Sequence, residues 1–209
     1  MAQRGEDIGL AVIGCGPIGR IRAELARDYP GIGWLGVCDI REELARDLAQ
    51  DAEADFHTTD AAELLARPEV NAVIIATQES AHVVPILQAL EHGHRLFIEK
   101  PLAVDVRDSE KVAAAIEAAG VDAVMGYTQR FRRRFLTIKE RVMQGQVGAV
   151  TAVSARAMLN RTIAEMCLSR ANQHDTTTPV VISGTHVLDM CLWLMADRKP
   201  VSVYAHSTD

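Results

Sequence analysis

Three glycines with a fixed spacing are the first residues whose types suggest chemistry. Gly14, Gly16 and Gly19 follow a short apolar run and precede a segment with helical spacing. In such a strand–turn–helix, the first glycine permits the tight turn, the second lets backbone N–H groups approach a diphosphate, and the third lets the helix pack on the strand. The helix N-terminus adds partial positive charge. The spacing therefore predicts that this turn, including Pro17 and Ile18, binds a dinucleotide.

A carboxylate at the end of the next apolar run extends the pattern. Asp39 stands 20 residues after Gly19, where a carboxylate accepts hydrogen bonds from the adenosine ribose. A carboxylate repels a 2′-phosphate, which favours NAD over NADP, whereas Arg41 would favour NADP. We expect NAD as cofactor, with NADP as the alternative, and Asp39, Ile40 and Arg41 at the ribose. The other interpretation of Asp39 is a cap for the helix that follows.

A parallel sheet must position these residues, and strand and helix patterns alternate through the first half of the chain. Right-handed crossovers between such strands produce a parallel sheet covered by helices. The fold class is therefore α/β, with a doubly wound Rossmann sheet expected over residues 1–124. The expected strands cover 8–13, 33–38, 56–57, 70–76, 95–98 and 123–125, and the expected helices cover 18–29, 41–51, a short segment capped by Asp60, 82–92 and 105–119.

The pattern changes after residue 125, where we expect a second, shortened α+β domain over residues 125–209. Helical spacing covers about 131–144 and 184–196. Alternating apolar residues over 150–157 and 201–205 predict two strands with one buried face. Residues 160–179 are polar and carry little periodicity, which predicts a loop or lid where substrate specificity would reside.

Four short segments resemble the Gfo/Idh/MocA family of oxidoreductases (glucose–fructose oxidoreductase / inositol 2-dehydrogenase-like). Glu99-Lys100-Pro101 after the fifth expected strand is the most specific of these segments. The segments are Ala76-Thr77 with His82, Phe97 to Ala103, Gly126 to Phe131, and Gly184 to Asp189 followed by Trp193-Leu194. The resemblance covers nearly the whole chain.

The resemblance implies transfer of a hydride between a secondary alcohol of a sugar or cyclic polyol, of the inositol kind, and a nicotinamide. Lys100 would hold the reacting oxygen, His186 would act as general base, and Asp189 would share the helical face of His186. Without the resemblance, a solvated Lys100–Glu99 pair and a structural histidine are the default interpretations. Further cofactor contacts are expected from Thr77, His82, Glu99, Lys100 and Arg130.

Two features depart from the family pattern. Many members carry an aspartate four residues before the histidine, where this chain has Ile182. Either Asp189 or Asp175 substitutes, or Lys100 and His186 work without it, or the chemistry is lost. Members also usually continue past the last expected strand, so we expect either a homo-oligomer formed through the C-terminal sheet or a truncated chain.

Composition excludes some classes of partner. A net charge of −6 argues against nucleic acid, and the basic run 130–134 is interpreted as a solvated helix start, or else as a groove for a phosphate or the substrate. The four scattered cysteines lack metal-ligand spacing, so no metal is expected, and no apolar stretch approaches the ~20 residues of a membrane span. The expected protein is cytoplasmic, with a small sugar or polyol as its partner.

Three functions fit the sequence. The first is an NAD-dependent dehydrogenase acting on a CH–OH group. The second is a non-catalytic sensor or scaffold that keeps the dinucleotide site, an interpretation motivated by Ile182. The third is an enzyme that holds NAD tightly and recycles it within one turnover.

Overall fold

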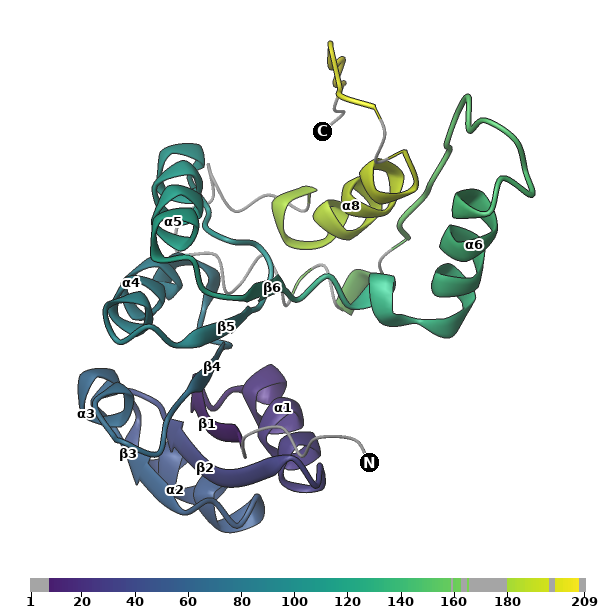
Figure 1. Cartoon of the computed structure of the whole chain (residues 1–209). Helices are drawn as coiled ribbons and strands as arrows, with labels where there is room; N and C mark the ends of the chain where they lie inside the picture. The colour runs from purple at the N-terminus through teal and green to yellow at the C-terminus, as the bar shows by residue number, and fades with distance from the viewer. Residues whose placement is uncertain (1–7, 159, 163–164, 166–179, 196–197, 207–209) are drawn as a thin grey trace. The chain divides into compact units, whose positions relative to one another are not determined.

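The chain divides into two compact units, Met1–Gly126 and Tyr127–Asp209 (Figure 1). The computed structural model describes residues 8–158, 160–162, 165, 180–195 and 198–206. The first unit contains the sheet and its covering helices, and the described residues of the second unit form helices and connecting segments.

A six-stranded parallel sheet forms the centre of the first unit. Its strands lie in the order β3-β2-β1-β4-β5-β6, and all five neighbouring pairs are parallel. The order reverses between β1 and β4, which is where open α/β sheets bind ligands. The strands are β1 (Ile8–Ile13), β2 (Ile32–Cys38), β3 (Phe56–Thr58), β4 (Ala72–Ile75), β5 (Arg95–Ile98) and β6 (Ala123–Met125). The α/β, Rossmann-type prediction is confirmed.

Helices cover both faces of this sheet, because alternate residues of the central strands point in opposite directions. Ala11 and Ile13 of β1 belong to a buried cluster with residues of α3, α4 and α5, whereas Leu10 and Val12 belong to a second cluster with residues of α1 and α2. These helices are α1 (Pro17–Arg27), α2 (Glu42–Asp51), α3 (Ala61–Leu65), α4 (Val83–Glu91) and α5 (Val106–Ala119). The nearly unbroken apolar strands are thus buried on both sides.

Local signals set the helix ends. The Asp60 side chain accepts a hydrogen bond from the N–H of Ala62, which confirms the expected cap of α3. Asp105 does the same for α5, since its Oδ1 accepts from the N–H groups of Arg107 and Asp108. Gly120 ends α5 in the left-handed conformation, with φ of +63°.

The second unit contains the two expected helices, with slightly different ends. A 3₁₀ turn, Thr128–Phe131, precedes α6 (Arg133–Met143), and a π-helical turn, Val180–Gly184, leads into α8 (Thr185–Leu194). Figure 1 shows α6 in green and α8 in yellow-green. No described helix of the chain is both long and apolar enough to cross a bilayer.

The two strands expected in the second unit do not form among the described residues. Residues 150–158 and 201–206 adopt no strand, and Val201 is 96% exposed. Alternation predicts which residues would share a face, but a strand needs a hydrogen-bonded neighbour, and neither segment has one among the described residues. The expected lid over 160–179 lies almost entirely outside the described residues.

The cap of α5 gives a stability prediction. We expect Asp105→Ala to lower the free energy of unfolding by about 1 kcal/mol, because two N–H groups of the first turn lose their acceptor. Urea denaturation measures the change. Glu117→Ala in the last turn of the same helix is the control, with a change below about 0.5 kcal/mol. Equal losses in the two variants would contradict the capping role.

Candidate functional site

The glycine turn between β1 and α1 is built from two close backbone contacts and one open position. Gly14 has φ of +101°, and a Cβ there would lie 2.5 Å from the backbone of Ala76, after β4. A Cβ on Gly19 would lie 1.7 Å from the Gly14 carbonyl oxygen. Gly16 differs, since no described atom outside its own stretch of chain lies within 4 Å of its Cβ position. The first and third glycines are needed for packing, and the middle one leaves space in front of the helix N-terminus.

Asp39 holds this turn from the end of β2. Its Oδ2 accepts a hydrogen bond of 2.8 Å from the N–H of Cys15, and its Oδ1 accepts one of 3.0 Å from the N–H of Arg41. The side chain is 11% exposed. Asp39 therefore orders both the turn and the entry to α2. Each carboxylate oxygen keeps a further lone pair, so these bonds leave acceptor capacity for a ribose hydroxyl.

The cysteines beside the turn are buried neutral thiols. Burial, followed by the nearby Asp39 carboxylate, raises the pKa of Cys15 and that of Cys38 to about 12 each. A thiol with so high a pKa supplies almost no thiolate at neutral pH, so neither residue is a nucleophile. Asp39 carries the charge in this corner of the site.

The residues next to Asp39 lie at the surface. Ile40 is 90% exposed and Arg41 is exposed as well. Pro17 and Ile18 are also exposed, at the start of α1. The structure thus brings the predicted turn and ribose residues to one corner of the sheet, with their side chains toward solvent.

His82 lies between the segments that follow β4 and β5. It is 1% exposed; its Nδ1 lies 2.8 Å from the carbonyl oxygen of Pro101, and its Nε2 lies 3.2 Å from that of Thr77. Burial lowers the pKa of His82, against the opposing effects of the two carbonyl contacts, Glu79 and Glu99. The neutral ring then donates through one nitrogen, and the shorter distance favours Nδ1. The ring nitrogens of His82 face backbone carbonyls, and its predicted contact with the cofactor stays a prediction.

Glu99 has a partner that the sequence did not reveal. Arg22 of α1 donates to Glu99 Oε1 from both Nε, at 2.8 Å, and Nη2, at 2.5 Å. The guanidinium carbon of Arg22 also lies 5.0 Å from the centre of the Phe97 ring. The carboxylate of Glu99 is therefore matched by an arginine from the helix that follows the glycine turn. No sequence signal links positions 22 and 99.

Lys100 follows β5 at the carboxyl edge of the sheet, as expected. It is partly exposed, and its peptide bond to Pro101 is cis. The backbone on its N-terminal side is fixed, because the N–H of Glu99 donates to the carbonyl of Ile75 at 2.9 Å. The backbone that carries Lys100 is thus held in place at the end of β5.

In the second unit, Arg130 and Asp189 form a bidentate ion pair. Arg130 donates from Nε at 2.9 Å and from Nη2 at 2.5 Å to the two oxygens of the buried Asp189. The Arg130 guanidinium also lies within 6 Å of the ring centres of Tyr127 and Trp193. Both carboxylate oxygens of Asp189 are thus bound by one arginine. The predicted roles of Arg130 in cofactor binding and of Asp189 in catalysis stay predictions.

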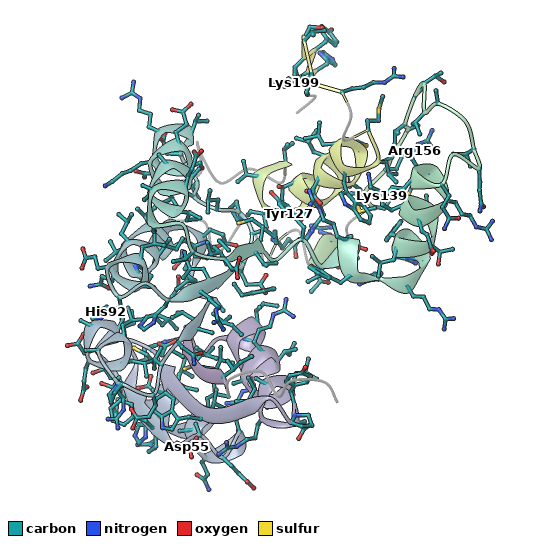
Figure 2. All side chains as sticks on the ribbon, viewed as in Figure 1. Asp55, His92, Tyr127, Lys139, Arg156 and Lys199 are labelled. Atoms are coloured by element: carbon teal, nitrogen blue, oxygen red, sulfur yellow. The ribbon has the colours of Figure 1, made fainter. Side chains whose placement is uncertain are left out.

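Lys139 completes the same cluster. Figure 2 shows its side chain reaching from α6 toward α8, where Nζ donates to the carbonyl oxygen of Trp193 at 2.7 Å. Its ammonium also lies 5.6 Å from the centre of the Trp193 ring. These contacts join α6 to the C-terminal end of α8 and so support the helix that carries His186.

His186 lies near the N-terminal end of α8, beside Tyr127. The two rings meet edge to face, with centres 6.1 Å apart, and the Tyr127 hydroxyl lies 3.1 Å from Thr185 Oγ1. Ile182, at the position of the family aspartate, is buried. Asp175, the other carboxylate considered as a substitute, lies outside the described residues.

Comparisons with known proteins place these features in a family. Residues 8–127 match the oxidoreductase family with an NAD-binding Rossmann fold (Gfo/Idh/MocA). Scyllo-inositol 2-dehydrogenase (NAD(+)) of Bacillus subtilis (strain 168) is 31% identical over 143 residues, which are 68% of this chain and 42% of the relative. Inositol 2-dehydrogenase/D-chiro-inositol 3-dehydrogenase of Shouchella clausii (strain KSM-K16) is 31% identical over 205 residues, which are 95% and 54%.

A solved structure shows the same fold. The myo-inositol 2-dehydrogenase of Lactobacillus plantarum superposes with a TM-score of 0.80 at 19% identity, over 90% of this chain and 56% of that one. The chain spans about half the length of the relatives it matches. Because the family match covers more than half of the chain, and includes the glycine turn, Asp39 and Glu99-Lys100-Pro101, the chain belongs to the Gfo/Idh/MocA family of oxidoreductases, whose Rossmann domain binds NAD.

Proposed function

We propose that the protein is an NAD-dependent dehydrogenase that transfers a hydride between a secondary alcohol of a cyclic polyol or sugar and the nicotinamide. The observation that carries this proposal is the placement of Lys100, a family signature residue, at the same sheet edge as the dinucleotide turn. The inositol dehydrogenases among the relatives support a polyol of the inositol class.

The residues of the turn fit a dinucleotide. The open position at Gly16 lies at the N-terminus of α1, where backbone N–H groups and the helix dipole favour a diphosphate. Asp39 offers acceptors to the ribose hydroxyls, and the exposed Ile40 offers an apolar surface for the adenine. NAD, when bound, supplies the hydride acceptor. Thr77, at the end of β4, would border the nicotinamide half.

Side chains of the protein itself bind the alcohol oxygen and accept the hydroxyl proton. In the proposal, the Lys100 ammonium donates a hydrogen bond to the alcohol oxygen and stabilises the negative charge that develops on it. His186 takes the hydroxyl proton as a general base, a role that imidazole side chains commonly perform. Asp189 acts indirectly, because Arg130 already binds both of its oxygens. The proton transfer thus proceeds without a carboxylate at position 182.

A sensor that binds NAD without chemistry is the second candidate, favoured by the buried Ile182. The discriminating experiment mixes the protein with NAD and a panel of inositols and sugars and follows NADH absorbance. NAD that raises the melting temperature without being reduced on any substrate would favour the sensor. Nucleotide released only on denaturation would indicate an enzyme that recycles a tightly held NAD.

A cytoplasmic location and a homo-oligomer remain part of the proposal. Assembly through a C-terminal sheet requires residues 150–157 and 201–205 to pair as strands when copies associate. Sedimentation of the purified chain over a range of concentrations measures the association.

The glycine turn predicts two different outcomes for the same substitution. We expect Gly16→Ala to fold normally and to lose at least about tenfold in NAD affinity, because its Cβ enters the space of the diphosphate. Gly19→Ala should instead lower the melting temperature, because its Cβ meets the Gly14 carbonyl. Calorimetric titration and thermal melting measure both. A Gly16→Ala variant with unchanged NAD affinity would exclude this turn as the diphosphate site.

The Asp39 carboxylate predicts cofactor preference. We expect Asp39→Asn to shift the ratio of NAD to NADP affinity toward NADP by about tenfold or more, because the charge that repels a 2′-phosphate is gone while Arg41 remains. The asparagine oxygen can still accept from the N–H of Cys15, so the turn keeps its bond. Titrations with both nucleotides measure the ratio. An unchanged ratio of NAD to NADP affinity would exclude Asp39 as a determinant of cofactor preference and leave only its structural role in the turn.

The proposed role of Lys100 predicts that its loss affects turnover but not NAD affinity. We expect Lys100→Ala to lower turnover by about two orders of magnitude or more and to leave NAD affinity within about twofold. Lys111→Ala, an exposed lysine on α5, is the matched control and should change neither quantity. Unchanged turnover in Lys100→Ala would remove this lysine from the mechanism.

A further inference from the structure

Two side chains from different helices bind the residues on either side of Lys100. Arg22 of α1 binds the carboxylate of Glu99, and His82, just before α4, contacts the carbonyl of Pro101. We propose that Arg22 and His82 are positioning residues that clamp Glu99–Pro101 and thereby aim the Lys100 ammonium. The proposal rests on the proposed function, because it gives these residues their effect on the chemical step.

The Arg22 contact is specific in geometry. Two nitrogens of one guanidinium converge on Oε1 of Glu99, and the Phe97 ring supports the guanidinium from the side. The Arg22 and Glu99 side chains are 23% and 12% exposed, so the pair is shielded from bulk water and holds its geometry better than a surface pair. Gly126 leaves space for Oε2 of Glu99, which lies 2.8 Å from where a Cβ at position 126 would stand.

This contact also has an electrostatic consequence. A carboxylate beside a lysine draws its ammonium and stabilises the charged form. The Arg22 guanidinium offsets the carboxylate of Glu99, the residue just before Lys100 in the chain. Since Arg22 belongs to the helix whose N-terminus faces the diphosphate site, the same helix orders both the cofactor corner and the Lys100 segment.

The His82 contact fixes the other side. Its ring is 1% exposed and lies between two carbonyls that follow neighbouring strands, Thr77 after β4 and Pro101 after β5. Neither carbonyl belongs to a ladder of the sheet, so His82 links two loop segments that the strands do not link. Loss of the ring would leave the buried Pro101 carbonyl without this donor, which favours rearrangement of the segment.

The Arg22 half is tested with Arg22→Gln against Arg27→Gln. Arg27 lies on the same helix and pairs with Asp55 and the Glu53 carbonyl, away from the site. We expect Arg22→Gln to lower kcat by at least about tenfold with NAD affinity within twofold, and Arg27→Gln to change neither. The substrates are NAD with myo-inositol and scyllo-inositol.

The His82 half is tested with His82→Leu, His82→Asn and His94→Leu. His94 is the matched control, because it is also buried and its Nε2 contacts the Leu65 carbonyl at 2.9 Å, elsewhere in the fold. We expect His82→Leu to lower kcat at least tenfold, His82→Asn to recover part of the loss through an amide donor in the place of Nδ1, and His94→Leu to lower only the melting temperature. A loss of NAD affinity with unchanged kcat would assign His82 to the cofactor and overturn the clamp.

A readout independent of turnover separates this proposal from the proposed function. Acetic anhydride modifies lysines in their neutral form, and mass spectrometry gives the rate at each site. At a fixed pH we expect Arg22→Gln to change the modification rate of Lys100 by at least about threefold, because a segment without the Arg22–Glu99 contact no longer holds the Lys100 side chain in one environment, while Lys111 is unaffected. If wild type reduces no NAD but this rate change is found, the proposed reaction fails and the clamp stands. Equal Lys100 rates in wild type, Arg22→Gln and Arg27→Gln overturn the clamp.

Discussion

The structure depends on the close approach of the β1–α1 turn to the end of β4. A methyl group on Gly14 or Gly19 would overlap backbone atoms of Ala76 or of Gly14 itself, so the helix can begin this close to the sheet only with hydrogen at those positions. This approach places the N–H groups at the start of α1 beside the point where strand order reverses. Asp39, bonded to the Cys15 N–H, then fixes the turn from the other strand.

Each of the two units contains a matched pair of charges. Arg22 offsets Glu99, and Arg130 offsets Asp189 within its own unit. The two thiols near the turn are neutral because burial raises their pKa. Asp39 keeps acceptor capacity beyond its two backbone bonds. Arg41 also lies 3.6 Å from Asp39 Oδ1, so the carboxylate is paired at the surface and still has lone pairs for a hydroxyl-bearing ligand.

Patterns local in sequence predicted most of the first unit. Strand β5, residues 95–98, has the expected bounds. Asp60 marks the start of α3 and Gly120 the end of α5 where expected, because each signal acts within one turn of chain. The Arg22–Glu99 pair joins residues 77 positions apart, and nothing in either segment signals it. The predictions of strands at 150–157 and 201–205 were wrong, because alternation is a local pattern, whereas a strand requires a hydrogen-bonded partner from elsewhere in the chain.

The central claim is that the backbone of the glycine turn binds the diphosphate of NAD. An amide NMR titration of the ¹⁵N-labelled chain with NAD tests it most directly, because it reports on individual N–H groups. The account predicts saturable shifts of the Cys15, Gly16 and Ile18 amides, with the amides of β3 and α3 little changed. Saturating NAD that leaves the turn amides unshifted would contradict it.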